Sequence, residues 1–207
     1  MGLVDAMSSV FRSACCGSRP AILGLCGLAG SGKDTAAEAL VDDGWVRVAF
    51  ADAIREGLLA IDPIVGSGAD CVCWRISDYV ESGGWDGAKR NPEVRFLLQR
   101  YGTEGGREVH GDDCWLNIGR RKIVEALAAG KCVVVTDVRF ANEAELIHEL
   151  GGQVVKVLRP SSGLSGSNSA HASERLDFVS DRVLVNDSTI SSLHERIRRV
   201  AALGRPG

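Results

Sequence analysis

The sequence predicts an α/β fold in which a five-stranded, mostly parallel sheet is flanked by helices. One observation is a short apolar run that passes into a glycine-rich turn and then into a helix-favouring stretch. A second is a set of valine-rich runs without polar alternation, which is typical of parallel strands covered on both faces. A third is that helix-favouring stretches separate these runs, so the crossovers are expected to be right-handed.

Each element has its own pattern. The first strand is the apolar run AILGLC, the second alternates as WVRVAF, and the others are rich in valine. The five strands are expected at 21–26, 45–50, 131–136, 153–158 and 182–185. The helices are expected at 33–41, 92–101, 115–129, 141–150 and 191–203.

Length and composition are those of an ordinary globular chain. With 207 residues, 45% hydrophobic and 25% charged, one compact domain at 21–207 is expected after a flexible extension at 1–20. Two segments interrupt the alternation of strands and helices: 62–91, rich in Gly and Trp, and 161–181, whose first part is rich in Ser and Gly. Long irregular insertions in α/β domains are usually substrate-covering loops or disorder.

Charge and cysteine content exclude several classes of protein. A net charge of -3 gives no general attraction to nucleic acid. No stretch of about 18 apolar residues and no secretory leader occurs, so we expect a cytoplasmic protein without a membrane partner. The 7 cysteines include no C-x-x-C pair, so they are interpreted as free thiols and not as zinc ligands or disulfides.

The strongest motif is G-L-A-G-S-G-K-D-T at 27–35, between the first strand and the first helix. Its glycines let backbone N–H groups wrap a phosphate, the helix N-terminus favours negative charge, and Lys33 can reach the β- and γ-phosphates. A chance glycine-rich turn would not need the strand, the lysine and the helix together. The residues expected to hold ATP phosphates here are Gly27, Ala29, Gly30, Ser31, Gly32, Lys33, Asp34 and Thr35.

The loop departs from G-x-x-x-x-G-K-[ST] at one position, because Asp34 follows the lysine and the hydroxyl comes one residue later, at Thr35. This puts the usual direct metal contact in doubt. The displaced hydroxyl is similar to that of adenylate kinase and its relatives, where the metal is held largely through water. Mg²⁺ is therefore expected near Asp34, Thr35 and Asp137, through water.

Other phrases extend the likeness: FADAIRE at 50–56, RYGTE at 100–104, TDVRFANE at 136–143, VLRP at 157–160, HASE at 171–174 and VNDSTISSL at 185–193. With the GKDT loop, they make residues 22–200 resemble the phage-type deoxynucleoside monophosphate kinases of the P-loop kinase superfamily. The resemblance implies an acceptor-side insertion at 62–91, a short lid at 161–181, and transfer of the ATP γ-phosphate to a dNMP, with Mg²⁺. It implies a role in supplying nucleotides for phage DNA replication, in the host cytoplasm.

The site residues beyond the loop combine this resemblance with position at strand ends, where open α/β sheets bind ligands. Lys33, Asp137, Arg139 and Arg159 would stabilise the transferring phosphate, and Arg159, Arg175 and Asn186 would contact ATP. The acceptor would be bound by Asp52, Arg55, Arg95, Gln99, Gly102, Thr103 and Arg139.

Each of these roles has a plain structural alternative: Arg55, Arg95 and Arg100 as surface helix charges, Asp137 with Arg139 as a turn salt bridge, and Asn186 as a turn residue. His171 with Glu174 is interpreted as a helix entry capped by Ser173. Trp74, Tyr79 and Trp85 are either base-stacking groups or core.

Transfer to a phosphate oxygen needs positioning and charge neutralisation more than a base, which suits scattered arginines. Two rival functions remain. One is another small-molecule P-loop kinase, such as a dephospho-coenzyme A or phosphomevalonate kinase. The other is a nucleotide-sensing module, which would carry an absent guanine-reading N-K-x-D phrase and would not need these arginines. The expected partners are small nucleotides, and a homodimer is left open.

Overall fold

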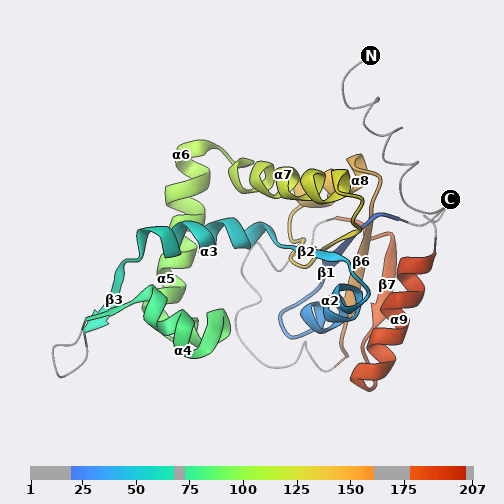
Figure 1. Cartoon of the computed structure of the whole chain (residues 1–207), viewed down its shortest axis with the longest axis horizontal. Coiled ribbons are helices and arrows are strands. Elements are labelled where there is room, and N and C mark those ends of the chain that lie inside the picture. Colours follow the sequence, from blue (N-terminus) through green and yellow to red (C-terminus); the bar gives the residue numbers. More distant parts are fainter. Residues whose placement is uncertain (1–19, 68–72, 161–177, 204–207) are drawn as a thin grey trace, which may run out of the picture. The chain divides into compact units, whose positions relative to one another are not determined.

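The computed structural model describes residues 20–67, 73–160 and 178–203. The chain separates into two compact units (Figure 1). The sheet unit comprises Met1–Ala49 and Arg120–Gly207, and the helical unit comprises Phe50–Gly119.

The sheet unit contains the five expected strands, all parallel to their neighbours. The strand order β2-β5-β1-β6-β7 places β1 in the middle, with every residue buried. In register, Leu23 of β1 lies between Val134 of β5 and Gln153 of β6. The strands are β1 (Ile22–Cys26), β2 (Val46–Val48), β5 (Val133–Val135), β6 (Gln153–Leu158) and β7 (Arg182–Val185). The predicted α/β class, strand number and parallel arrangement are confirmed.

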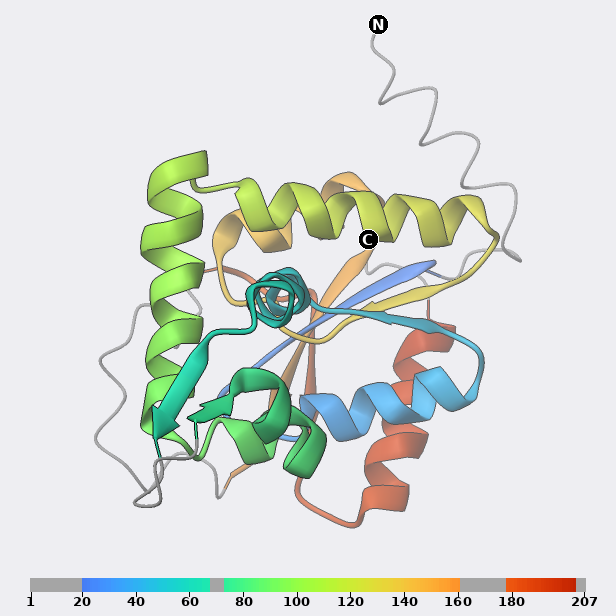
Figure 2. The same cartoon turned by 60° about the vertical axis from the view of Figure 1, so that its left-hand side comes forward.

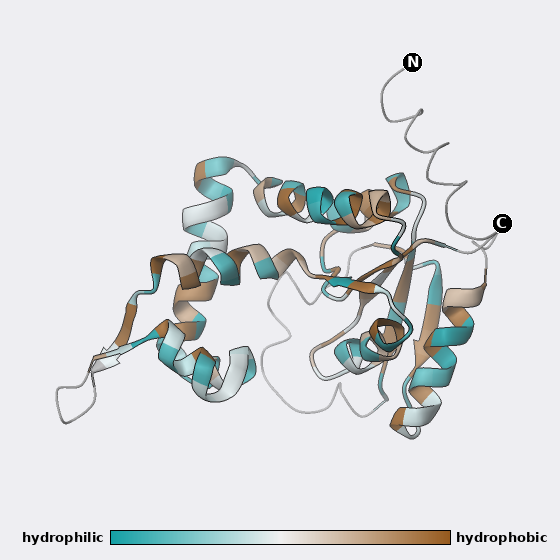
Figure 3. Ribbon diagram, viewed as in Figure 1, coloured by the Kyte–Doolittle hydropathy of each residue, from teal (hydrophilic) through white to brown (hydrophobic). Residues whose placement is uncertain are grey.

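Helices cover this sheet on both faces. On one face, α2 (Lys33–Asp42) packs against α9 (Ile190–Ala202), and on the other α8 (Ala141–Glu149) packs on β1 and β6 (Figure 2). The apolar side chains between the sheet and the α2–α9 pair form a continuous core that includes Leu25, Leu40, Val155, Leu193 and Ile197. In Figure 3 the central strands are brown, whereas α9 shows both brown and teal faces, as a helix with one solvated side should.

The helical unit is built from α3 (Phe50–Ile61), the antiparallel pair β3 (Ile64–Ser67) and β4 (Cys73–Arg75), α4 (Ile76–Ala88) and α5 (Pro92–Arg100). The last of these continues as a π-helix, η1 (Tyr101–Arg107), and then as α6 (Glu108–His110). The unit has a core of its own, formed by Leu58, Val65, Ile76, Ala88 and Val94. Helix α7 (Cys114–Ala128) begins in this unit and ends in the sheet unit.

Three expectations about residues 45–110 are wrong. Segment 62–91 is not irregular, because its described part forms β3, β4 and α4. The glycines that suggested a loop lie at a kink within α4, where Gly83 and Gly84 have non-helical backbone angles. The strand expected at 45–50 ends at Val48, and Phe50 begins α3. The helix expected to end at 101 continues to His110 through the π-helical turns.

Within the described residues, no helix is both long and apolar enough to cross a membrane.

Candidate functional site: the phosphate-binding loop and its neighbours

The glycine-rich loop joins β1 to α2, as the motif predicts. Gly27 has φ 143°, and a Cβ there would lie 2.4 Å from the Val157 carbonyl oxygen. Gly32 has φ 99° and forms the N-cap of α2 without any side-chain cap. Because Gly32 has no side chain with which to cap them, the first N–H groups of α2 can bind an anion.

Lys33 begins α2 and turns back over the loop. Its Nζ donates hydrogen bonds of 2.8 Å to the carbonyl oxygens of Gly27 and Leu28. Burial lowers the pKa of Lys33 from its ordinary value, and the neighbouring charge of Arg139 lowers it further, against the opposing effects of Asp34, Cys26 and Asp137. The charges of Asp137 and Arg139, which follow β5, therefore both act on Lys33.

A buried hydroxyl lies in the same loop. Ser31 is 1% exposed, and within the part of the chain that the structure describes its Oγ has no hydrogen-bond partner. A buried hydroxyl without a partner is costly, and an oxyanion in the loop would satisfy it. This donor and the uncapped α2 N-terminus fit the phosphates of ATP.

The segment after β5 brings the expected strand-end residues to the loop. Its backbone is held by two hydrogen bonds, from Thr136 N to Val48 O at 3.1 Å and from Val138 N to Leu25 O at 3.2 Å. Val138 is fully buried, Asp137 is half-buried and Arg139 is exposed. Their electrostatic effect on Lys33 supports a shared site with the loop.

Two of the three expected magnesium residues are carboxylates beside Lys33, and one or two carboxylates are what a phosphate-bound Mg²⁺ usually takes from a protein. Asp34 and Asp137 both act on Lys33, and the half-buried Thr35 follows Asp34 on α2. Among the described residues there is no group of three or more His, Cys, Asp or Glu side chains that could hold a metal. Few protein ligands are what a phosphate-bound Mg²⁺ needs.

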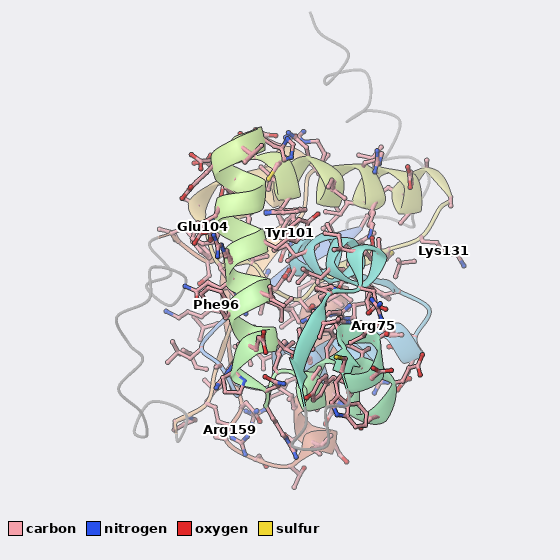
Figure 4. All side chains as sticks on the ribbon, turned by 90° about the vertical axis from the view of Figure 1, so that its left-hand side faces the viewer. Arg75, Phe96, Tyr101, Glu104, Lys131 and Arg159 are labelled. Atoms are coloured by element: carbon pink, nitrogen blue, oxygen red, sulfur yellow. The ribbon has the colours of Figure 1, made fainter. Side chains whose placement is uncertain are left out.

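Two of the expected ATP contacts, Arg159 and Asn186, follow β6 and β7, which lie on the opposite side of β1 from β5. Arg159 is exposed directly after β6, and Figure 4 shows it at the end of that strand. Asn186, directly after β7, donates from Nδ2 to the Ser31 carbonyl oxygen at 2.9 Å. Asn186 thus supports the loop itself, a contact that sequence reasoning did not predict.

The acceptor residues expected on α3 form a small cluster in the helical unit. Arg55 Nη1 lies 3.0 Å from Asp52 Oδ1, and the guanidinium stands 5.9 Å from the ring centroid of Trp85. Trp85 and Tyr79 also pack against the core of the unit, while Trp74 is 45% exposed and lies 6.2 Å from Tyr79, centroid to centroid.

The acceptor residues expected on α5 and η1 lie along one helical stretch. Arg95, Gln99 and Thr103 are exposed at successive intervals of four residues, and Gly102 is buried. The Gly102 carbonyl oxygen accepts a 2.7 Å hydrogen bond from Trp115 Nε1.

Arg100 lies 2.7 Å from Glu104 and over the Phe96 ring, so its contacts are those of a helix-surface charge. Figure 4 shows Phe96 and Glu104 on one side of this helix and Tyr101 on the other. Arg175, His171, Ser173, Glu174 and most of the expected lid lie outside the described residues.

Loop, lysine and parallel strand ends together define the class: the sheet unit is a P-loop nucleotide-binding fold. Residues 85–197 match the profile of the family described as deoxynucleotide monophosphate kinase. A putative deoxynucleotide monophosphate kinase from Acanthamoeba polyphaga mimivirus is 30% identical over 196 residues, covering 85% of this chain and 93% of the relative. The chain belongs to the deoxynucleotide monophosphate kinase family.

Two solved structures are more distant. An APS kinase from Mycobacterium tuberculosis has 16% identity and a TM-score of 0.41, covering 89% of this chain and 99% of its own. TT1252 from Thermus thermophilus has 19% identity and a TM-score of 0.48, with 89% and 97% covered. The parallel sheet order and the phosphate-binding loop define the fold of the sheet unit.

Proposed function

We propose that the chain transfers the γ-phosphate of ATP to the phosphate of a deoxynucleoside monophosphate, releasing ADP and a dNDP. The observation that carries this is the P-loop with its folded-back Lys33 and its buried Ser31 hydroxyl, which has no partner among the described residues, in a member of this family. An oxygen of the acceptor phosphate attacks the γ-phosphorus, and the bond to the bridging oxygen of ADP breaks. The acceptor is already anionic, so no general base is needed.

The proposed roles follow from position. Lys33 and the α2 N-terminus hold the β- and γ-phosphates, with Gly27, Ala29, Gly30, Ser31 and Gly32 lining the loop. When bound, Mg²⁺ would neutralise phosphate charge, held by Asp34, Thr35 and Asp137 through water. Arg139 and Arg159 would bear on the transferring group.

The helical unit is proposed to bind the dNMP. Arg55, oriented by Asp52 and by the Trp85 ring, is the proposed ligand of the acceptor phosphate. Arg95, Gln99 and Thr103, with the Gly102 backbone between them, are proposed to contact the rest of the acceptor. We also propose that the chain acts in the cytoplasm on small nucleotides, without a nucleic-acid partner.

The test is a coupled assay of ADP release with each of the four dNMPs, with dephospho-coenzyme A and phosphomevalonate as competing acceptors. Activity with at least one dNMP, and loss of that activity in Lys33→Met, is expected. Turnover with dephospho-coenzyme A or phosphomevalonate in place of any dNMP would favour that rival kinase, and ATP hydrolysis without any acceptor would favour the nucleotide-sensing module.

A further inference from the structure

Glu143 is a buried carboxylate under the segment that carries Asp137 and Arg139. It lies in the first turn of α8 and is only 5% exposed. Its Oε2 accepts two backbone hydrogen bonds, from Arg139 N at 2.7 Å and from Phe140 N at 3.1 Å. Neither the loop motif nor the strand-end rule pointed to this residue.

The second of these bonds is an ordinary helix cap, but the first is not. A glutamate at the third position of a helix commonly reaches back to the N–H of the N-cap residue, here Phe140. Glu143 reaches one residue further, and its bond to Arg139 is the shorter of the two. The extra bond does not serve the helix end, because Arg139 precedes the N-cap residue Phe140.

The burial makes this contact strong. A carboxylate out of water is costly unless hydrogen bonds and favourable dipoles replace the solvent. Here two backbone N–H donors and the N-terminus of α8 supply part of that replacement, and charge-assisted bonds of this kind are about twice as strong as neutral ones. The backbone conformation at Arg139 and Phe140 therefore stabilises the buried carboxylate.

The other side of Arg139 is also fixed. Val138 is fully buried, its N–H is bonded to Leu25 O, and its Cγ2 lies so near Gly24 that a Cβ there would be 3.0 Å away. The backbone from which the Arg139 side chain leaves is thus held by Val138 on one side and Glu143 on the other. The charge of Arg139 acts on Lys33 from that position.

We infer that Glu143 is a positioning residue for phosphoryl transfer: its carboxylate fixes the Arg139 backbone so that the guanidinium stays beside the phosphate-binding loop. The inference rests on the proposed role of Arg139 in the reaction. Glu143 itself would touch neither nucleotide.

The test is a double-mutant cycle on the full chain, with Glu143→Gln and Arg139→Ala measured singly and together. Glu143→Gln should lower kcat/KM for the dNMP by about tenfold or more, since small displacements of a positioning group are costly to rate. If Arg139→Ala acts mainly on kcat, Glu143→Gln should act mainly on kcat, and if Arg139→Ala acts mainly on KM for the dNMP, so should Glu143→Gln. In the Arg139→Ala background, Glu143→Gln should have almost no further effect, because residues that act through one another are not additive.

The matched control is Glu145→Gln, the same chemical change on an exposed residue of the same helix, which should leave kcat/KM unchanged. Equal losses from Glu143→Gln in both backgrounds, or no loss in either, would overturn the inference while leaving the kinase activity established. Wild-type protein inactive with every dNMP would instead overturn the proposed function. If Glu143→Gln does not fold, Glu143→Asp, which keeps the charge but shortens the reach, serves in the same cycle.

Discussion

The side-chain amide of Asn186 donates a 2.9 Å hydrogen bond to the carbonyl oxygen of Ser31, 155 residues away in the sequence. The Asn186 backbone N–H is bonded in turn to Leu158 O at 2.6 Å, so the amide is anchored on the end of β6. The same amide lies so near Gly32 that a Cβ there would be 2.5 Å from Nδ2. The end of β7 thus fixes the turn of the loop from which the first N–H groups of α2 project.

Asn186→Ala should weaken ATP binding several-fold and lower the free energy of unfolding by about 1 kcal/mol, the usual effect of losing one hydrogen bond. The informative measurement is binding of inorganic tripolyphosphate beside ATP. A residue that supports the loop affects both ligands, whereas an adenine contact affects ATP alone. Weakening confined to ATP would indicate instead that Asn186 contacts the adenine base.

A neighbouring control is available in Asp187→Ala, which removes an exposed ion pair with Arg196 at 2.8 Å. Exposed pairs contribute little, so neither ATP binding nor stability should change beyond a few tenths of a kcal/mol, on the order of 0.5 at most.

The elements that could be predicted from the sequence are those with a strong local pattern. The valine runs of β5 and β6 and the GSGK turn each have one physical explanation, buried parallel strands and an anion-binding loop. The helical unit was harder, because glycines at 83 and 84 within α4 look like a loop unless the core around Ile76 and Val94 is known.

The contacts that support the loop and the segment after β5 could not be predicted. They join residues far apart in the sequence, or they involve residue types that are common at such positions. Nothing local marks Asn186 as a partner of Ser31, and Glu143 looks like any helix-capping glutamate. The phrase TDVRFANE did contain Glu143, and its spacing from the strand end is the one signal that could have directed attention there.

Lys33→Met should reduce kcat by about a hundredfold or more, because a cation beside the transferring charge is lost.

The Lys33→Met variant should keep the stability of the wild type, since the lowered pKa of Lys33 means that the folded state disfavours its charge. In the wild type, between the lowered pKa of folded Lys33 and its ordinary value of 10.5, the unfolded chain binds more protons than the folded chain. The free energy of unfolding therefore increases as the pH rises through this range. Thermal unfolding of both proteins between pH 7 and pH 10 checks this: the gain should be present in wild type and absent from Lys33→Met. A variant that unfolds at a much lower temperature at pH 7 would contradict it.

Gly106→Ala should destabilise the chain by about 1–3 kcal/mol, the usual effect of overpacking. A Cβ at this position of η1 would lie 2.3 Å from Trp115 Cζ2, and that ring is held by its bond to Gly102 O. Combining Gly106→Ala with Trp115→Phe should cost less than the sum of the two single changes, because the smaller ring leaves room. Chemical denaturation of the three variants measures this.

The control for that series is Gly87→Ala in α4, where a Cβ would meet no atom within 4 Å. It should be neutral or stabilising by up to about 1 kcal/mol, since alanine favours helix. Additive losses for Gly106→Ala and Trp115→Phe would show that the ring is not what excludes a side chain at 106.

The thiol of Cys26 should resist alkylation at pH 8 while that of Cys73 reacts. Cys26 is the last residue of β1 and is 1% exposed, whereas Cys73 is exposed on β4. Burial raises the pKa of Cys26 to about 11, against the opposing charges of Lys156 and Lys33, so almost no thiolate forms at pH 8. Because the folded pKa lies above the ordinary value of 9.0, the native state holds its proton, and this contribution to stability is complete below pH 9 and is lost as pH rises toward about 11. Peptide mapping after timed iodoacetamide treatment distinguishes the cysteines, and the difference in unfolding free energy between wild type and Cys26→Ala should shrink over pH 9–11. Equal labelling of Cys26 and Cys73 in folded protein would mean that the end of β1 opens to solvent, and that the phosphate-binding loop beside it is not held as described.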